Sequence, residues 1–396
     1  MTEDEILLLD SPELRASVES NIGRKPEDVA LDKRLPHARL VATQVKYLGR
    51  ARHKLPSYYS ARAILPPLAF EQSSSEAAAG RHDWHGEVCI DLTCGLGVDS
   101  FMMSRRFGRV ITVERDKALA TAARLNFARL GVTNVEVVES SAEEFLRDYA
   151  ASGRKADMVY ADPDRRSAQG RKLVRMEDCS PDMSKLLPLA ERVAERVAVK
   201  LSPLFDVDEA FRLFAGGCVV EVYSLAGECK EVVVETGRAV QRRTLCATAE
   251  GLGSVSYGYP LERSGTDAVF APPYSYMVIP DVALRKARMV AAYRDSVMPW
   301  AQLSSDNGYL FADRLPEGVI GRVFEVEKME RFDAGRLKRR LRNAAISAAD
   351  LYIGDSPLGA PELARRLGIR EGGVAKLAFT EICKELWVVV LKGVSL

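Results

Sequence analysis

The sequence predicts an α/β protein built on a doubly wound parallel sheet, with a helical segment before the sheet and smaller α+β modules after it. Two observations lead to this prediction. Short apolar runs with strand character alternate with helical patterns from Val88 to about residue 223, as expected when a crossover helix returns the chain to each next parallel strand. The first apolar run also ends at a glycine turn, Cys94-Gly95-Leu96-Gly97, that leads into a helix.

The individual elements follow from the alternation of these patterns. Strands are expected at 88–92, 109–114, 134–138, 157–161, 196–201 and 218–223. Helices are expected at 98–107, at 116–130, from Ala142 onward, at 181–195 and at 206–215. Ligands of such sheets bind beyond the carboxyl ends of the strands, near the point where the strand order reverses. The residues at the strand ends are therefore the candidate site residues.

Composition limits the class of protein. A chain of 396 residues that is 47% hydrophobic can bury a core and form two or three domains. The net charge is only +1, so a nucleic-acid surface has to be local. The acidic start and the lack of a long apolar run predict a cytoplasmic protein without membrane contact. The seven cysteines include no CxxC pair, so we expect reduced thiols, and His82 and His85 alone are weak metal ligands.

The glycine turn and two carboxylates indicate a nucleotide-like ligand. Glycines let the backbone approach a ligand, and the helix that follows offers unpaired N–H groups. A dinucleotide fingerprint would need a third glycine at Ser100, where the chain has none. Asp91 ends the first strand and either accepts nearby N–H groups or contacts a cationic ligand, and we expect the ligand. Glu114 ends the second strand and either binds both ribose hydroxyls or caps a helix.

Two further segments border this predicted site. Ser141 and Ala142 follow the third strand, where a backbone N–H and a short side chain would meet an adenine ring. The polar cluster 71–76, Glu-Gln-Ser-Ser-Ser-Glu, either caps a helix or lies across the ligand as a lid, and its pattern favours the cap.

Three motifs together resemble the class I S-adenosylmethionine-dependent methyltransferases. They are DLTCGLGVDS at 91–100, VERD at 113–116 and ADPDRR at 161–166. The glycine turn is also similar to that of trimethylguanosine synthases. With the polar cluster 71–76 and the C-terminal tail, the chain resembles a group of bacterial methyltransferases that carry a THUMP-like domain. The resemblance implies a Rossmann-like sheet and S-adenosyl-L-methionine as cofactor, held by Gln72, Asp91, Thr93, Gly95, Gly97, Asp99, Glu114, Ser141 and Ala142.

The fourth strand is followed by a departure from the pattern of this family. Enzymes that methylate base nitrogens end the strand in D/N/S-P-P-aromatic, where the ring stacks on a flipped base. Here Asp164 and Arg165 replace the second proline and the aromatic residue. We expect Asp162 to accept a hydrogen bond from the attacking amine and Pro163 to stiffen the turn, with Asp164 beside them in the catalytic segment. Stacking would have to come from Arg165 or from a tyrosine of the N-terminal segment.

Basic residues near these motifs suggest contacts with phosphates. Arg165 and Arg166 either hold phosphates or form a salt-bridged surface loop. Lys200, in an apolar strand, needs a partner, which is Asp162 or a substrate phosphate. In the N-terminal segment, Lys46, Arg50, Arg52 and Lys54 alternate with Tyr47, Tyr58 and Tyr59. This mixture suits RNA, although a solvated helix face is the simpler interpretation.

The C-terminal part is predicted to hold two modules. Residues 246–320 mix short strands with a helical run at 281–296, as in a small α+β module, for which a ferredoxin-like arrangement is one option. Residues 321–396 resemble a THUMP-like RNA-binding domain. A basic helix there is the best phosphate-contacting surface, with solvation as the alternative. Its basic residues are Arg336, Lys338, Arg339, Arg340 and Arg342.

These observations predict four regions and one activity. The regions are an N-terminal helical segment at 1–80, a methyltransferase domain at 81–245, and the two modules at 246–320 and 321–396. The activity is S-adenosylmethionine-dependent methylation of a nitrogen of an RNA base, with RNA as partner and no metal. A small-molecule or protein methyltransferase and a non-catalytic RNA-binding protein are the alternatives.

Overall fold

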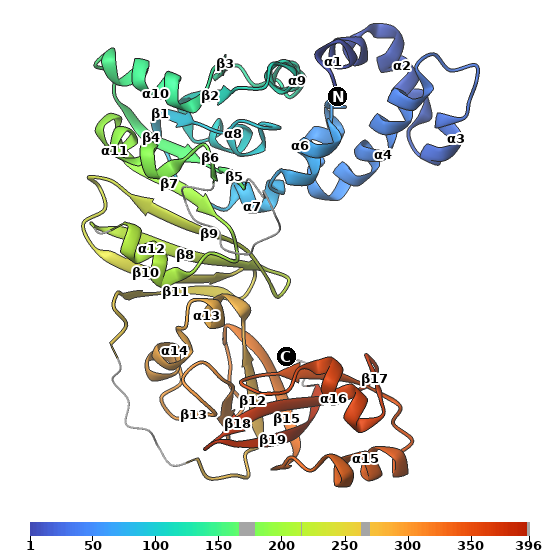
Figure 1. The fold of residues 1–396 in the computed structure, drawn as a ribbon, viewed down its shortest axis with the longest axis vertical. Coiled ribbons are helices and arrows are strands. Elements are labelled where there is room, and N and C mark those ends of the chain that lie inside the picture. Colours follow the sequence, from blue (N-terminus) through green and yellow to red (C-terminus); the bar gives the residue numbers. More distant parts are fainter. Residues whose placement is uncertain (166–178, 215, 263–269, 394–396) are drawn as a thin grey trace. The chain divides into compact units, whose positions relative to one another are not determined.

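The computed structural model describes residues 1–165, 179–214, 216–262 and 270–393. The chain forms two compact units (Figure 1). The first consists of Met1–Leu201 and Glu235–Gln241, and the second of Ser202–Val234 and Arg242–Leu396. Among the described residues, no helix is both long and apolar enough to cross a bilayer.

The first unit is built around five parallel strands in the order β7-β4-β1-β2-β3. Their bounds are β1 (Gly86–Asp91), β2 (Phe107–Glu114), β3 (Val135–Glu139), β4 (Ala156–Ala161) and β7 (Ala194–Leu201). From β1 the chain adds β2 and β3 on one side and then β4 and β7 on the other. The strand order therefore reverses at β1, which confirms the predicted doubly wound sheet and marks the edge where ligands bind.

Helices connect these strands close to the predicted positions. They are α8 (Val98–Met103), α9 (Lys117–Arg129), α10 (Ala142–Ala151) and α11 (Met183–Val193). Asp116 caps α9 and Ser141 caps α10, each by accepting a backbone N–H with its side chain. Helix α8 begins after Gly97, whose φ of +83° is left-handed, and a Cβ there would lie 2.7 Å from Phe127 Cζ. Only glycine fits this turn without strain.

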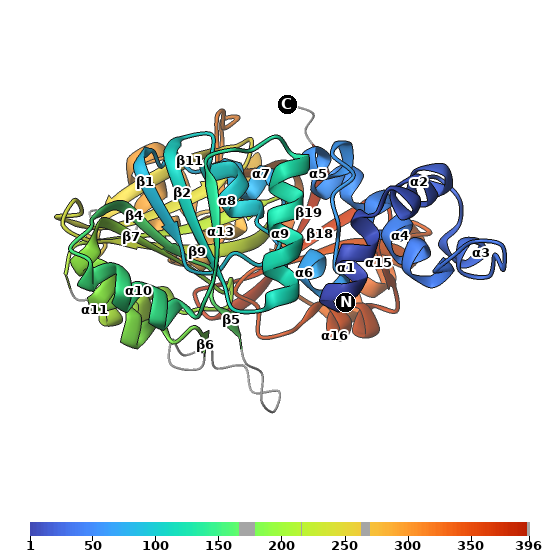
Figure 2. The ribbon, with the colours of Figure 1, turned by 90° about the horizontal axis from the view of Figure 1, so that it is seen from above.

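Seven helices precede the sheet. They are α1 (Glu3–Asp10), α2 (Pro12–Asn21), α3 (Pro26–Ala30), α4 (Ala38–Lys54), α5 (Pro56–Ser60), α6 (Pro67–Gln72) and α7 (Glu76–Gly80). Helix α1 lies beside α9 in Figures 1 and 2, and Glu3 forms an ion pair of 3.1 Å with Lys117. The buried core of these helices also contains Leu96, Val98 and Phe127. Residues 1–80 therefore do not have a core separate from that of the methyltransferase sheet.

Two buried amides attach the segment between α5 and α6 to its neighbours. Asn126, fully buried in α9, donates to Ile64 O at 2.9 Å and accepts from Ile64 N at 2.7 Å. Gln44 of α4 makes the same pair of bonds with Leu65, at 3.2 and 3.0 Å. These bonds satisfy peptide groups that have no water to bond.

The second unit begins with a segment, residues 202–234, that the sequence assigned to the methyltransferase domain. It contains α12 (Val207–Leu213), β8 (Cys218–Leu225), most of β9 (Glu228–Thr236), β10 (Arg243–Ala249) and β11 (Gly253–Gly258). Strand β10 pairs parallel with β8 and antiparallel with β11. The structure therefore groups residues 202–234 with the C-terminal part, whereas the sequence predicted a single domain at 81–245.

One eight-stranded sheet forms the rest of the second unit, in the order β13-β14-β12-β15-β19-β18-β16-β17. Its strands are β12 (Tyr276–Pro280), β13 (Gln302–Leu303), β14 (Leu310–Ala312), β15 (Gly321–Arg331), β16 (Ala348–Ile353), β17 (Arg370–Glu371), β18 (Ala375–Ile382) and β19 (Glu385–Gly393). Strand β15 pairs with β12 on one side and with β19 on the other. Strands from both predicted ranges, 246–320 and 321–396, therefore share one sheet.

The helices of this unit are short. The predicted helix at 281–296 is two helices, α13 (Val282–Lys286) and α14 (Val290–Val297), because Arg288 between them has a φ of +55°. Helix α15 (Ala334–Asn343) is the predicted basic helix, and α16 (Ala360–Leu367) ends at Gly368 in a left-handed conformation, as its sequence predicts.

We expect Asn126→Ala to lower the free energy of unfolding of the first unit by about 2–4 kcal/mol. The substitution leaves the N–H and C=O of Ile64 buried without partners. Urea titration followed by Trp84 fluorescence, with Trp300 and Trp387 replaced by Phe, measures this unit alone. Exposed Asn343→Ala in α15 should change the value by less than about 0.5 kcal/mol. An equally small effect of Asn126→Ala would contradict the role given to the buried amide.

Candidate active site

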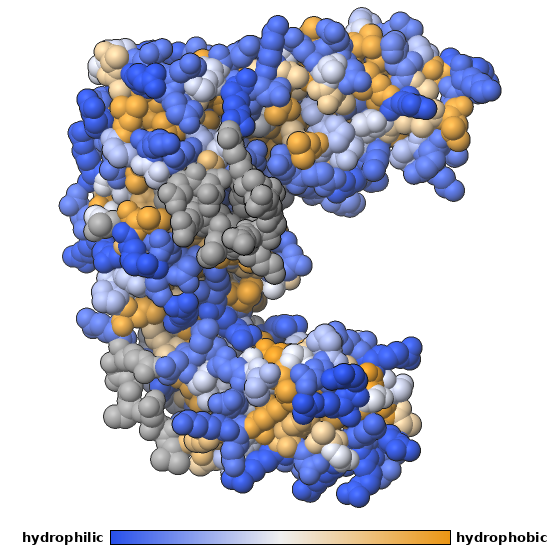
Figure 3. Space-filling view, viewed as in Figure 1, coloured by the Kyte–Doolittle hydropathy of each residue, from blue (hydrophilic) through white to orange (hydrophobic). Residues whose placement is uncertain are grey.

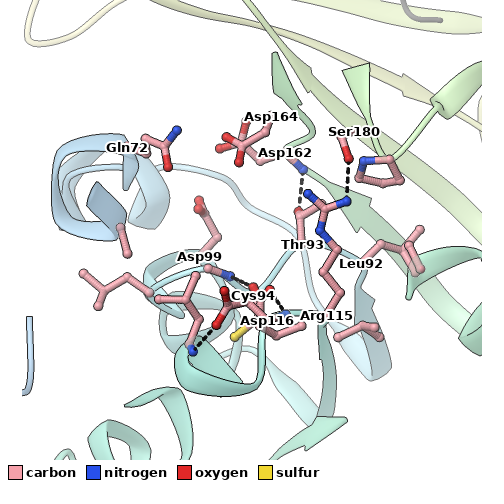
Figure 4. Close-up of a pocket in the computed structure, with 18 of the residues that line it drawn as sticks. Gln72, Leu92, Thr93, Cys94, Asp99, Arg115, Asp116, Asp162, Asp164 and Ser180 are labelled. Atoms are coloured by element: carbon pink, nitrogen blue, oxygen red, sulfur yellow. Dashed lines mark hydrogen bonds between the residues drawn. The ribbon is translucent and has the colours of Figure 1, made fainter. Parts of the chain in front are cut away.

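A cavity of about 340 Å³ opens at the carboxyl ends of β1, β2 and β4 in the first unit (Figure 4). Its walls come from α6, the glycine turn, the ends of β2, β3 and β4, and the short strands β5 (Asp164–Arg165) and β6 (Cys179–Ser180). The polar and glycine residues that line it are Gln72, Ser73, Thr93, Gly95, Asp99, Glu114, Arg115, Asp116, Ser140, Glu143, Asp162, Asp164 and Ser180. The cavity thus lies at the edge where the strand order reverses.

Asp91 lies beneath the glycine turn and does not line this cavity. Its side chain is fully buried, and its carboxylate accepts from Thr93 N at 2.9 Å, from Ser100 Oγ at 2.5 Å and from Thr112 Oγ1 at 3.2 Å. The predicted contact between Asp91 and a cationic ligand is therefore corrected. The carboxylate binds donors of its own chain, because burial leaves it no other partners.

Glu114 does line the cavity, and its carboxylate is fixed by the backbone. One oxygen accepts from Gly95 N at 2.9 Å and the other from Asp116 N at 2.8 Å. Burial raises the pKa of this carboxyl, while those two backbone donors lower it. Each carboxylate oxygen has a second lone pair. Glu114 can therefore hold the glycine turn and accept two hydroxyls of a ligand at the same time.

Asp162 and Lys200 form an ion pair at the ends of β4 and β7. Lys200 Nζ lies 2.6 Å from Asp162 Oδ2, and the side chains are 14% and 32% exposed. The backbone N–H of Asp162 donates to Thr93 Oγ1 at 2.7 Å, and that hydroxyl lies 3.3 Å from Asp91 Oδ1. The structure supports Asp162 rather than a phosphate as the partner of Lys200, and it connects both residues to the buried carboxylate of Asp91.

Ser74 extends this network to the other wall of the cavity. Its hydroxyl accepts from Lys200 Nζ at 2.7 Å and donates to Asp99 Oδ2 at 3.0 Å. Within the same polar cluster, Ser75 caps α7 while Gln72 and Ser73 line the cavity. The cluster therefore caps a helix, as its pattern favours, and two of its residues form part of the cavity wall.

Asp164, Ser180 and Arg115 form the outer wall. Asp164 in β5 pairs with Ser180 in β6, and Arg115 Nη1 donates to Ser180 Oγ at 3.0 Å (Figure 4). Pro163 is buried next to them. The side chain of Arg165 and all of Arg166 lie outside the described residues. Sequence reasoning missed Arg115 and Ser180, because nothing in the chain order shows that β6 returns to this edge.

Two predicted ligand contacts lie elsewhere. Gly97 does not line the cavity and instead packs against Phe127. Ser141 caps α10 through a bond from Glu144 N at 3.2 Å, and its neighbours Ser140 and Ala142 line the cavity. The sequence pattern does not specify this orientation of the chain, and contacts of Gly97 and Ser141 with the cofactor stay predictions.

Charge distinguishes this cavity from the rest of the chain. Of the described residues that line it, six are acidic and one, Arg115, is basic. The described residues contain no group of three or more His, Cys, Asp or Glu that could hold a metal ion. A cavity with this excess of carboxylates favours a ligand that carries positive charge.

The basic helix α15 belongs to the second unit. Arg336, Lys338, Arg339 and Arg342 are exposed, and Arg340 is half-buried and paired with Glu330. Leu337 and Leu341 form its buried face. In the described part of the chain, no carboxylate lies within 4 Å of Lys338, Arg339 or Arg342.

Asp91 should make the stability of the first unit depend on pH. Burial raises its pKa from the usual 3.8 to about 6. Because the folded-state pKa is the higher one, the stability that this group contributes is complete below about pH 4 and is lost as the pH rises through 6, in total about 3 kcal/mol. Urea titrations from pH 4.5 to pH 7.5 should show the advantage of wild type over Asp91→Asn shrinking across this range. Parallel curves would contradict the assignment.

Comparisons with known proteins agree with this geometry. Residues 77–176 match the family described as Conserved hypothetical protein 95, and residues 321–392 match the THUMP domain-like family. An uncharacterised S-adenosylmethionine-dependent methyltransferase of Mycobacterium tuberculosis is 28% identical over 78% of this chain and 83% of its own. An uncharacterised RNA methyltransferase of Thermotoga maritima is 32% identical, over 31% of this chain and 29% of its own.

A solved structure shares the whole fold. It is a protein of Porphyromonas gingivalis W83, provisionally named a methyltransferase, with a TM-score of 0.83, 23% identity and coverage of 100% of both chains. None of these three relatives is named a trimethylguanosine synthase, so that resemblance of the glycine turn stays a prediction. The chain is an S-adenosylmethionine-dependent methyltransferase of the class I fold, with a THUMP-like domain at its C-terminus.

Proposed function

We propose that this enzyme transfers a methyl group from S-adenosylmethionine to a nitrogen of an RNA base. The observation that carries the proposal is the carboxylate of Asp162, which the ion pair with Lys200 fixes at the end of β4 in the same cavity as Glu114. Glu114 would then face the methyl donor, and Asp162 would face the acceptor.

The donor would occupy the inner part of the cavity. Glu114 would accept the ribose hydroxyls with the lone pairs that the backbone does not use. Ser140 and Ala142 would border the adenine, and Asp99 would face the amino-acid part. S-adenosylmethionine carries a sulfonium and an ammonium charge, which the acidic lining favours.

The acceptor nitrogen would lie beside Asp162. The sulfonium methyl is already electrophilic, so catalysis consists mainly of holding the nucleophile in line at about 3–3.5 Å. The nitrogen forms a bond to the methyl carbon, the bond from that carbon to sulfur breaks, and the nitrogen then loses a proton. Asp162 would accept a hydrogen bond from the amine and stabilise the positive charge that develops on it.

A ring carbon is a less suitable acceptor in this cavity. A pyrimidine carbon becomes nucleophilic only after a nucleophile such as a thiolate has added to the ring. Cys94 is the cysteine that lines the cavity among the described residues, and burial raises its thiol pKa well above the usual value. A thiol in that state is a poor nucleophile.

RNA is the acceptor favoured by the second unit and by the relatives. The chain has a THUMP-like domain, the basic helix α15 exposes four cations, and the relative from Thermotoga maritima is named an RNA methyltransferase. A small-molecule or protein acceptor would leave the exposed cations of α15 without a role.

Methyl transfer to RNA should depend on Asp162. Incubation of the enzyme with radiolabelled donor and total RNA should label RNA, and Asp162→Asn should lower kcat about 10²–10³-fold, because the neutral amide stabilises the developing charge poorly. Exposed Asp148→Asn in α10 is the matched control and should leave kcat unchanged. Donor binding without transfer to any RNA, protein or small-molecule extract would favour a non-catalytic RNA-binding protein. Label that enters only protein or small molecules would reject RNA as the acceptor.

Donor affinity should depend on Glu114. Glu114→Ala removes the acceptor for the ribose hydroxyls and two backbone bonds, so we expect the Kd for S-adenosylmethionine to rise about 10–100-fold. Isothermal titration calorimetry measures this, with exposed Glu87→Ala in β1 as the control. An unchanged Kd in Glu114→Ala would place the donor elsewhere.

A further inference from the structure

A segment of the first unit carries only positive charge. Residues 33–70 contain eight lysines and arginines and neither aspartate nor glutamate. Since 55 of the 396 residues are acidic, a stretch of 38 residues would ordinarily hold about five carboxylates. Their absence concentrates positive charge where helix α4 lies.

Helix α4 presents this charge on one side. Its buried residues are Val41, Ala42, Gln44, Val45, Tyr47, Leu48 and Ala51. The opposite side carries Arg39, Lys46, Arg50, His53 and Lys54, which we call the α4 basic face. Arg39, Lys46, Arg50 and Lys54 follow one another at intervals of seven, four and four residues, which are whole or nearly whole turns of a helix with 3.6 residues per turn, so their side chains form one row. In Figure 3 the visible face of the N-terminal helices carries hydrophilic residues interspersed with hydrophobic ones.

The α4 basic face ends at the wall of the catalytic cavity. Arg50 forms a bidentate ion pair with Glu71, and Lys54 Nζ donates to Phe70 O at 2.6 Å. Both acceptors belong to α6, and the α6 residues Leu68, Ala69 and Gln72 line the cavity. Leu68 is 70% exposed as well, which places it at the cavity mouth.

The outer cations of the row have no acidic partner in the described part of the chain. Arg39 and Lys46 are exposed, and no carboxylate lies within 4 Å of either. From Arg39 to Lys54 the helix extends about 22 Å, which is long enough to meet several phosphates of one strand.

The aromatic residues between these cations do not form a stacking platform. Tyr47 is 9% exposed and packs against Phe70, and Tyr58 is fully buried with its hydroxyl bonded to Leu96 O at 3.3 Å. Tyr47 and Tyr58 are therefore too buried to stack on bases, and Tyr59, the third tyrosine of the segment, is half-buried beside Arg62. The contacts that the α4 basic face can make are charge contacts with phosphates.

We propose that the α4 basic face binds the phosphate backbone of the RNA acceptor and leads it to the mouth of the catalytic cavity. This inference rests on the proposed function. Anionic lipid is the less suitable partner, because the row is interrupted by Thr43 and Gly49 and not by apolar side chains that would enter a bilayer.

The double variant Arg39→Gln with Lys46→Gln tests the proposal in the full-length protein. Its matched control is Arg147→Gln with Arg192→Gln, which removes two exposed charges from α10 and α11 of the same unit. Fluorescence anisotropy with a fluorescein-labelled RNA of mixed sequence, about 20 nucleotides long, gives the Kd between 50 and 300 mM NaCl. We expect the α4 variant to bind about tenfold more weakly at 100 mM and its slope of log Kd against log salt to fall by about 1–2. The control should stay within about twofold of wild type.

Further measurements separate this inference from the function on which it rests. Calorimetry should give the same S-adenosylmethionine affinity for both variants, and the α4 variant should show a raised KM for RNA with an unchanged kcat. A wild-type enzyme that labels RNA, together with an α4 variant of unchanged Kd and salt slope, would overturn the inference and leave the function standing. A wild type that neither binds nor labels RNA would overturn both. Loss of binding to phosphatidylserine vesicles, with RNA binding unchanged, would overturn the inference in favour of a membrane.

Discussion

The buried carboxylate of Asp91 is the constraint on which the catalytic edge of the sheet depends. It accepts from Thr93, Ser100 and Thr112, and these donors come from the residue just before the glycine turn, from α8 and from β2. A buried carboxylate without such donors would be costly, so the three segments cannot separate without exposing or protonating it. Through Thr93, which accepts from the backbone of Asp162, the same carboxylate also fixes the end of β4.

The N-terminal helices form part of the active site. Ser74 connects Lys200 to Asp99 across the cavity. The carboxylate of Glu76 accepts from Ser57 N at 2.8 Å, which holds α7 against α5. Helix α6 supplies one wall of the cavity. A methyltransferase sheet without residues 1–80 would therefore lose one wall of its cavity and the neighbour that positions the ammonium of Lys200.

The parts of the fold that depend on local sequence could be predicted, and the parts that depend on distant pairing could not. The strands and helices around Asp91 and Glu114 follow from hydrophobic periodicity and caps, which are properties of short stretches. The single sheet that joins the predicted modules 246–320 and 321–396 depends on the pairing of β15 with β12 and β19. A pattern within a short stretch of sequence does not predict which distant strands pair. In the site, Glu114 and Asp162 could be predicted as candidates because each follows from the end of a strand. The positions of Ser74 and Arg115 could not be predicted, because they depend on contacts between segments far apart in the chain.

Opposite charges on two neighbouring surfaces explain how one enzyme could accept a cationic donor and an anionic polymer. Six carboxylates in the cavity favour S-adenosylmethionine, and they favour it over the demethylated product, which lacks the sulfonium charge. The same carboxylates repel phosphates, so an RNA backbone has no electrostatic reason to enter the cavity. Cations on α4, joined to the cavity wall through Glu71 and Phe70, would keep the backbone outside. Only a base, which carries no charge, would then pass from the positively charged α4 basic face into the negatively charged cavity and reach Asp162.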